Sequence, residues 1–282
     1  MKNLKVVKKY DGYNLINFLQ SNFNGLSTST IYKALRKKDI IINNIRVKEN
    51  TKVHENDEII FYITDEYLFK KVNIEKIYED DNILAVYKPE DIEVVSNDKY
   101  ETLTSILEKE YNYISPCHRL DRNTKGICLF AKNEEALNIL LNKFKNHEIE
   151  KYYKCLVYGI PKEKSKTLEA YLFKDNKKSL VYISDTPKKG YVKIITSYKL
   201  LKKFDNNTSL LEVQLHTGKT HQIRAHLAHI GHPIIGDGKY GNYEINKKLK
   251  KTVQELTAYK LCFNFKEDAG MLNYLNKQTI KI

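Results

Sequence analysis

Residues 118–126 of this chain are His118-Arg119-Leu120-Asp121-Arg122-Asn123-Thr124-Lys125-Gly126, a stretch that holds one carboxylate between two arginines. Its second half is polar and ends in glycine, which is typical of a turn. The apolar run Ile127–Ala131 follows and indicates a buried strand, and Asn133 then predicts the N-cap of a helix. We therefore expect Asp121 on a loop ahead of a strand-and-helix unit, where a rigid scaffold can present it to a ligand. From the spacing alone, a surface loop with an ordinary Arg–Asp ion pair is the alternative.

The composition bounds the size of the fold and the kind of partner. With 282 residues the chain has the length of about two domains. It carries 48 Lys+Arg against 35 Asp+Glu, a formal charge of +13, which favours a polyanionic partner such as nucleic acid. A lysine-rich surface without such a partner is the alternative. No apolar run reaches the length of about 18 residues that a membrane span needs, and Met1–Tyr10 is too charged for a signal peptide, so we expect a cytoplasmic protein without membrane association.

The cysteines and histidines do not form a metal-binding pattern. The four cysteines show no Cys-x-x-Cys spacing and are predicted to be free thiols: Cys117, Cys128, Cys155 and Cys262. Five histidines lie between His216 and His232, which makes a metal site a rival interpretation. Their spacing is irregular, and no His-Glu-x-x-His motif occurs. We therefore expect no bound metal.

Residues 13–63 predict a small basic unit. Ser27-Thr28-Ser29 offers N-caps for a helix, and Asn43-Asn44 between two isoleucine-containing runs indicates a tight hairpin. The cations on the polar faces of that helix are Lys33, Arg36 and Lys37. Such a helix favours contacts with phosphates, which give affinity without much sequence readout. An ordinary solvated helix face is the alternative.

Two later segments carry residues that a site could use. Residues 150–159 alternate as a strand does and include Tyr153, whose ring can stack on a base and whose phenol can hold or move a proton. In a chain with 21 tyrosines, a structural tyrosine is the alternative. The strand-like run Leu210–Leu215 leads into His216–Leu227, where Thr220 predicts the cap of a helix that ends at Gly231.

Three motifs in these segments resemble those of the RluA-type pseudouridine synthases, in the family's order. The first is His-Arg-Leu-Asp-x-x-Thr-x-Gly at residues 118–126. The second is Lys-x-Tyr-x-Ala-x-Val-x-Gly at residues 151–159, where Cys155 stands in place of the usual alanine. The third is Thr-Gly-Arg-Thr-His-Gln-Ile-Arg-x-His-Leu at residues 217–227, with Gly236-Asp237 as a fitting continuation. There Lys219 replaces the usual arginine, which keeps the charge but loses the fork geometry.

The resemblance implies an α+β fold in two domains. Residues 71–282 are expected to form the catalytic domain, with an extended, mostly antiparallel mixed β-sheet flanked by helices. Residues 1–70 are expected to form a small α/β RNA-binding domain similar to that of the ribosomal small-subunit protein S4. The resemblance further implies a bacterial, monomeric enzyme.

The resemblance also implies an activity and a set of site residues. Enzymes of this family isomerise uridine in RNA to pseudouridine without a cofactor. Asp121 is expected to be the catalytic carboxylate, Tyr153 to lie against the target uracil, and Arg224 to pair with the carboxylate. The residues expected to bind RNA are Arg119, which fills the space that the flipped uridine leaves, Lys219, Lys33, Arg36 and Lys37. The expected substrate is large-subunit ribosomal RNA, with transfer RNA as the alternative.

Two other functions stay open on the sequence alone. A non-catalytic RNA-binding protein could keep this fold, but the presence of Asp121, Tyr153 and Arg224 argues against it. A metal-dependent hydrolase acting on nucleic acid is the second, and metal analysis of the purified protein would distinguish it. A single carboxylate in the motif favours an isomerase, because a glycosidase normally needs two.

Overall fold

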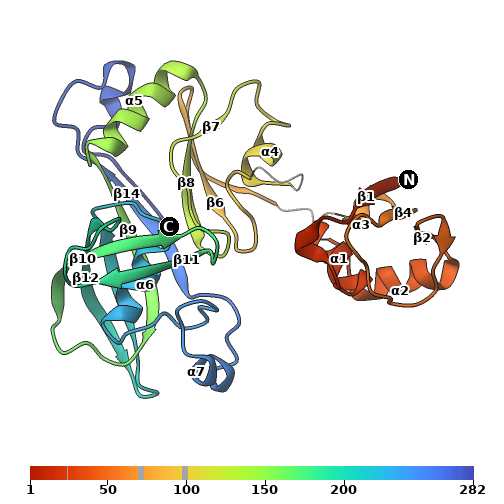
Figure 1. Cartoon of the computed structure of the whole chain (residues 1–282). Helices are drawn as coiled ribbons and strands as arrows, with labels where there is room; N and C mark the ends of the chain where they lie inside the picture. Colours follow the sequence, from red (N-terminus) through yellow and green to blue (C-terminus); the bar gives the residue numbers. More distant parts are fainter. Residues whose placement is uncertain (24, 69–72, 97–100) are drawn as a thin grey trace. The chain divides into compact units, whose positions relative to one another are not determined.

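The computed structural model describes residues 1–23, 25–68, 73–96 and 101–282 (Figure 1). The chain divides into two compact units, one formed by Met1–Asn73 and the other by Ile74–Asn97 with Thr102–Ile282. Each unit has a β-sheet of its own. The boundary expected between residues 70 and 71 falls outside the described residues.

The first unit is a four-stranded antiparallel sheet with two main helices, and its strand order is β1-β4-β2-β3. Its elements are β1 (Lys2–Lys5), η1 (Lys8–Tyr10), α1 (Leu15–Asn22), α2 (Thr28–Lys37), β2 (Ile40–Ile42), β3 (Ile45–Arg46), β4 (Glu58–Phe61) and α3 (Asp65–Leu68).

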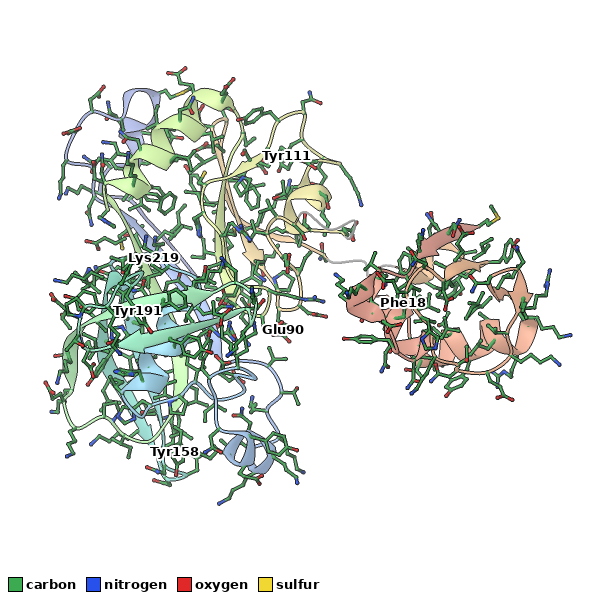
Figure 2. All side chains as sticks on the ribbon, in the orientation of Figure 1. Phe18, Glu90, Tyr111, Tyr158, Tyr191 and Lys219 are labelled. Carbon is green, nitrogen blue, oxygen red and sulfur yellow. The ribbon has the colours of Figure 1, made fainter. Side chains whose placement is uncertain are left out.

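Local signals account for the shape of this first unit. The Ser27 hydroxyl accepts a hydrogen bond from the backbone N–H of Thr30 and so caps α2, as predicted. Asn43 and Asn44 both have positive φ, 48° and 67°, which suits the tight turn between β2 and β3. Phe18 of α1 is buried in the interior of the unit (Figure 2). Apolar burial on one side of each helix leaves the charged side of α2 in solvent.

The second unit contains the larger sheet. Its strands are β5 (Glu75–Glu79), β6 (Ile83–Lys88), β7 (Ser115–Pro116), β8 (Lys125–Ala131), β9 (Ile149–Tyr158), β10 (Ser165–Asp175), β11 (Leu180–Ser184), β12 (Val192–Phe204), β13 (Thr208–Leu215), β14 (Leu256–Phe263) and β15 (Thr279–Lys281). Its helices are α4 (Leu103–Leu107), α5 (Glu134–Lys145), α6 (Gln222–His229), α7 (Tyr243–Lys248) and η2 (Gly270–Leu275).

The order along the larger sheet is β11-β10-β12-β13-β9-β14-β8-β6-β5, with β15 beside β14 and β7 beside β8. Every described pairing in it is antiparallel except β14 with β8. The predicted α+β fold with a mostly antiparallel mixed sheet is therefore confirmed. The late strand β14 inserts between β8 and β9, so the segments of the first and second motifs are joined through the C-terminal part of the chain.

The parallel contact explains the glycine that closes the first motif. Gly126 lies opposite Ala258 of β14 and has a φ of 115°. A Cβ at Gly126 would lie 2.0 Å from the carbonyl oxygen of Ala258, closer than any side chain can come. Glycine is therefore required where the chain leaves the Asp121 loop and enters β8.

Helix α5 packs against β8 and β9, and helix α6 packs against β11 and β12 (Figure 1). Leu140 of α5 packs in one apolar cluster with Ile149 of β9. Lys151 lies two residues further along β9 and therefore faces the same side. It is opposite Leu215 of β13, which is opposite Thr196 of β12, so these three side chains share that face. Helix α6 packs there, because Gln222 and His226 both hydrogen-bond to the Thr196 hydroxyl.

The structure differs from expectation in two stretches. In residues 162–208 the sequence predicts short strands around Leu180–Ile183 and Val192–Ser197, which are confirmed as parts of β11 and β12. It predicts exposed loops in the polar stretches of this region, but residues 165–175 form the strand β10. One face of these strands is exposed, so their polar residues are compatible with a sheet. Helix α6 begins at Gln222 with His221, rather than the predicted Thr220, at the N-cap. Within the described ranges, no helix has the length and apolar character needed to cross a membrane.

Candidate active site

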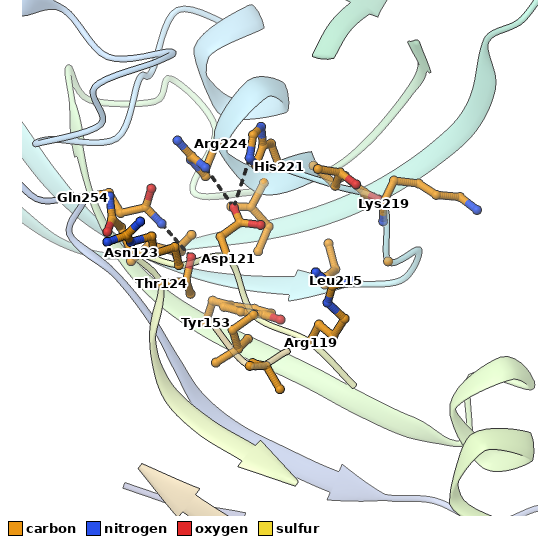
Figure 3. Close-up of a pocket in the computed structure, with 18 of the residues that line it drawn as sticks. Arg119, Asp121, Asn123, Thr124, Tyr153, Leu215, Lys219, His221, Arg224 and Gln254 are labelled. Atoms are coloured by element: carbon orange, nitrogen blue, oxygen red, sulfur yellow. Dashed lines mark hydrogen bonds and ion pairs between the residues drawn. The ribbon is translucent and has the colours of Figure 1, made fainter. Parts of the chain in front are cut away.

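The two helices leave the middle of the sheet face open, and a cleft of about 940 Å³ lies there (Figure 3). Its walls come from α5, from β9 and β13, from the start of α6 and from the loop that carries Asp121. The lining residues that carry positive charge are Arg119, Arg122, Lys151, Lys174, Lys219, Arg224 and Lys239, whereas only Glu93 and Asp121 among the lining residues are acidic. This excess of cations suits a polyanionic ligand.

The Asp121 loop is held by three hydrogen bonds. The carbonyl of Asp121 accepts a bond from the Thr124 N–H at 3.0 Å, which closes the turn. The Thr124 hydroxyl accepts a bond from Gln254 at 2.6 Å, next to β14. The carbonyl of Arg122 accepts a bond from the Lys88 ammonium at 2.8 Å. The loop is thus fixed to strands from two distant parts of the chain.

Lys88 is fully buried at the end of β6 and ties that strand to the loop. Its ammonium donates to the carbonyls of Pro89, Ile92 and Arg122, at 2.7, 2.7 and 2.8 Å. Burial lowers the pKa of Lys88 to about 8. Three carbonyl acceptors satisfy all three ammonium donors, which makes the burial of this lysine tolerable.

Arg224 of α6 lies between two carboxylates. Its Nη1 donates to Oδ2 of Asp121 at 2.9 Å. Its Nε and Nη2 donate to the two oxygens of Asp237, at 2.7 and 3.0 Å. The bidentate pair with Asp237 fixes the plane of the guanidinium, and the remaining nitrogen then fixes Asp121. Oδ1 of Asp121 accepts no hydrogen bond within the described part of the chain, and 25% of the side chain is exposed to the cleft.

Asp237 is the fully buried member of this group. Burial alone would raise the pKa of Asp237, but hydrogen bonds and charge from Arg224 outweigh it. The backbone N–H groups of Lys239 and Tyr240 add to this effect, and the pKa ends below its ordinary range. Asp237 therefore stays ionised at neutral pH and holds Arg224 in place.

Tyr153 of β9 lies beneath Asp121 and next to Arg119 (Figure 3). Only 5% of the residue is exposed. Burial, and then the charge of Asp121, raises the pKa of Tyr153, so the phenol stays protonated at neutral pH. Its ring forms a flat floor in the cleft, and its hydroxyl is available as a hydrogen-bond donor.

His221 lies beside Asp121. The Tyr240 hydroxyl accepts a hydrogen bond from the Val181 N–H at 2.9 Å and shares a second hydrogen bond with Nδ1 of His221, also at 2.9 Å. Burial lowers the pKa of His221, so the ring is neutral at pH 7, and its Nε2 lies 4.0 Å from Oδ2 of Asp121. The backbone of His221 has a φ of 52°, an uncommon conformation outside glycine that turns the ring toward the cleft.

The other residues predicted for the site are placed at different points. Arg119 is exposed and lines the cleft. Lys219 is exposed at its mouth, and its side chain extends away from Asp121 (Figure 3). The cations of α2 are exposed on the first unit: Lys33, Arg36 and Lys37. The cleft therefore unites Asp121, Tyr153, Arg224 and Arg119 from segments that lie far apart in the sequence.

Four residues of the site carry no predicted role: Lys88, His221, Asp237 and Tyr240. Asp237 and His221 belong to the third motif or its continuation, so the motif marks them without revealing what they do. Lys88 stands before a proline at the end of an apolar run, where a charge is unusual, and this is the one local signal that could have found it. Tyr240 has no such signal among 21 tyrosines.

The histidines of residues 216–232 have separate partners. His216 bonds to Ser197, His221 to Tyr240, His226 to Thr196, His229 to Asp185 and His232 to the carbonyl of Tyr158. Among the residues that the structure describes, no group of three or more His, Cys, Asp or Glu side chains is placed to hold a metal ion.

A cleft with one free carboxylate oxygen, an aromatic floor and a cationic rim is suited to an enzyme that acts on a nucleic-acid base or sugar. The sequence model of the RNA pseudouridylate synthase family matches residues 82–229, so the chain belongs to this family. The predicted family is thereby confirmed, and the protein is an enzyme that isomerises uridine in RNA to pseudouridine.

Individual relatives agree with this assignment. The ribosomal large subunit pseudouridine synthase C of Rickettsia prowazekii is 34% identical over 254 residues, 83% of this chain and 84% of the relative. The protein of the same name from Vibrio parahaemolyticus is 32% identical over 248 residues, 82% of this chain and 77% of the relative. The solved structure of human RNA Pseudouridylate Synthase Domain Containing 1 shares the fold, with a TM-score of 0.59 at 23% identity over 70% of this chain and 80% of that one.

Proposed function

We propose that this enzyme isomerises specific uridines of large-subunit ribosomal RNA, with Asp121 as the catalytic residue and Tyr153 and Arg224 as its partners. The substrate class is supported by the names of the relatives from Rickettsia and Vibrio. The enzyme is proposed to act as a monomer in the cytoplasm, where its RNA substrate is made. Residues 1–70 are proposed to be an S4-like domain that contributes affinity.

The observation that carries this proposal is the asymmetric environment of the Asp121 carboxylate. Arg224 binds Oδ2, and Asp237 holds Arg224, so the carboxylate cannot rotate freely. Oδ1 is left to react. An ionised oxygen held in this way can attack the sugar of a flipped uridine or accept a proton from it, and either step needs the charge that Arg224 stabilises.

The reaction is balanced without any second reactant. The bond from the sugar C1′ moves from N1 to C5 of uracil, and one proton moves from C5 to N1. Uracil must stay in the cleft while it turns. The Tyr153 ring is proposed to hold its face, and Arg119 at the rim is proposed to occupy the space that the flipped uridine leaves in the RNA. Lys219 and the α2 cations Lys33, Arg36 and Lys37 are proposed to bind phosphates.

The test is single-turnover pseudouridine formation on in-vitro-transcribed RNA. The wild-type enzyme should modify one or a few uridines of large-subunit ribosomal RNA, and the same uridines should lose their modification in a deletion strain. Transfer RNA transcripts serve as the matched control. Turnover on transfer RNA alone would refute the substrate assignment, and no turnover on either RNA would refute the proposed activity.

A further inference from the structure

Lys151 is a cation of the cleft that has no anionic partner among the described residues. It precedes Tyr153 by two residues on β9, so both side chains open onto the same face of the sheet, and both line the cleft. Within the described part of the chain, the Lys151 ammonium makes no hydrogen bond and no ion pair. The ammonium lies over the Phe144 ring, whose centroid is 5.3 Å away, and a Cβ added at Gly218 would lie 3.5 Å from it.

The charges around Lys151 do not compensate for its burial. Burial lowers the pKa of Lys151, and no carboxylate acts in the opposite direction. Burial also lowers the pKa of the nearby His118 to about 3, with the charge of Lys151 adding to the effect, so this imidazole is neutral at pH 7. Of the two acidic residues that line the cleft, Asp121 is bound to Arg224. The ammonium is therefore half-buried without a counter-charge, which costs free energy in the unliganded protein.

Lys151 differs in this respect from the other cations. Arg224 and Lys88 are buried but fully bonded, and Arg119 and Lys219 are exposed to water. A half-buried charge without an anionic partner, lining a cleft, is a candidate for binding a ligand of opposite charge. RNA carries one negatively charged phosphodiester per nucleotide. Residues two apart on a strand are separated by about 6.6 Å, so the Lys151 side chain starts beside the ring of Tyr153, on which the uracil is proposed to lie, and not beneath it.

We infer that Lys151 forms a phosphodiester-binding subsite, in which its ammonium pairs with the phosphate adjoining the target uridine. The subsite rests on the proposed function, because it positions the same substrate. When RNA binds, the Lys151 ammonium gains a phosphate as its ion-pair partner inside the cleft. Part of the binding energy is thereby used to place the sugar against Oδ1 of Asp121.

The test is a double-mutant cycle between the protein and the RNA backbone. The substrate is a short RNA that contains the uridine mapped by the turnover assay, with the phosphate on either side of that uridine replaced by an uncharged methylphosphonate. Lys151→Gln should weaken binding roughly tenfold. One of the two methylphosphonates should weaken wild-type binding equally and should have no further effect on Lys151→Gln. Lys151→Arg, which keeps the charge, should recover much of the affinity.

Lys154 provides the matched control. It lies on the opposite face of the same strand, with its ammonium over the Tyr259 ring, so Lys154→Gln should bind both RNAs as the wild type does. Lys151→Gln should also lower the salt slope of binding by about 0.7, the value for one single-strand phosphate, and should not lower the melting temperature of the free protein.

Two results would overturn the inference. One is a methylphosphonate that weakens RNA binding by the same factor in the wild type and in Lys151→Gln. The other is a Lys151→Gln enzyme that binds normally and turns over slowly at saturation, which would place the ammonium on the base. Turnover of the unmodified RNA by the wild type tests the proposed function separately, so failure of the subsite leaves that result intact.

Discussion

The cations of the cleft and the cations of α2 have the same charge and opposite surroundings. Arg224 is buried between Asp121 and Asp237 and uses three of its nitrogens in hydrogen bonds to them. On α2, in contrast, Lys33, Arg36 and Lys37 are all exposed, and none has an ion-pair partner within the described ranges. The same kind of charge therefore stands in two settings, bonded to carboxylates in the cleft and open to solvent on α2, where it is proposed to attract a polyanion.

The energetic cost of substituting a cation depends on whether it is buried. A buried ion pair is costly to desolvate, and removing one partner is strongly destabilising because it leaves a lone charge inside the protein. An exposed cation costs little, and salt screens its attraction to phosphate. Substitutions in the cleft should therefore affect rate and folding, whereas substitutions on α2 should affect affinity and its salt dependence.

The largest effect is expected for Asp121→Asn, which keeps the shape of the side chain and removes its charge. The protein should fold and bind RNA, and single-turnover pseudouridine formation should fall by about 10⁴-fold or more. Mass spectrometry of the variant should exclude deamidation back to aspartate. Measurable turnover by the verified variant would contradict the role of Asp121.

Asp237→Asn should weaken the fold as well as the activity. It leaves Arg224 buried without its bidentate partner, so the free energy of unfolding should fall by about 3–5 kcal/mol at pH 7. Because the folded-state pKa of Asp237 is lowered, its contribution is complete above its unfolded pKa of about 3.9 and is lost as the pH falls through the folded value. The difference in the free energy of unfolding between wild type and variant, measured by urea denaturation, should therefore decrease below about pH 4.

The control for that prediction is Asp185→Asn. Asp185 also pairs with a basic side chain, His229, but its own side chain is 80% exposed. Its substitution should change the free energy of unfolding by less than about 0.5 kcal/mol. An equal loss in the two variants would show that burial is not what distinguishes the pairs.

Arg224→Lys tests whether charge without fork geometry is enough. A lysine cannot bind both oxygens of Asp237 and hold Asp121 as well. The turnover rate at saturation should fall about 10²-fold, since a displaced reactive group of that kind is costly, with RNA affinity nearly unchanged. A variant with wild-type turnover would show that Asp121 needs only a nearby positive charge, as the α2 cations are proposed to provide for phosphate.

Tyr153→Phe tests a group that is neither charged nor paired. The phenyl ring keeps the floor of the cleft, and only the hydroxyl is lost. Because the phenol is protonated at neutral pH, its contribution should be one hydrogen bond, and turnover at saturation should fall roughly tenfold. A loss beyond about 10²-fold would instead indicate that the hydroxyl transfers a proton.

The smallest effect on rate is expected for the triple substitution of Lys33, Arg36 and Lys37 by glutamine. The plot of log affinity against log salt should become shallower by about 2–3 for loss of three phosphate contacts. Turnover at saturating RNA should remain that of the wild type. An unchanged salt slope would show that α2 does not contact RNA.

Local chemistry made much of the second unit predictable. Asn133 caps α5, Gly231 follows the end of α6, and the strands that contain Ile127 and Tyr153 occur where their patterns place them. Each of these features depends on residues within a few positions of one another. Strand β10 escaped prediction because its exposed face is polar, and its stability comes from pairing with β11 and β12.

The features of the site also separate into those that the sequence predicts and those that depend on the tertiary structure. The motifs named Asp121, Tyr153 and Arg224 as candidates, and these three residues meet in one cleft. Only the tertiary structure decided that Arg224 reaches Asp121 from 103 residues away and is itself held by Asp237, that Lys88 fixes the loop, and that Lys151 has no anionic partner among the described residues. The physical reason for this division is that the sequence alone specifies which side chains can carry a charge. Their burial, their hydrogen-bond partners and their free lone pairs depend on segments that only folding brings together.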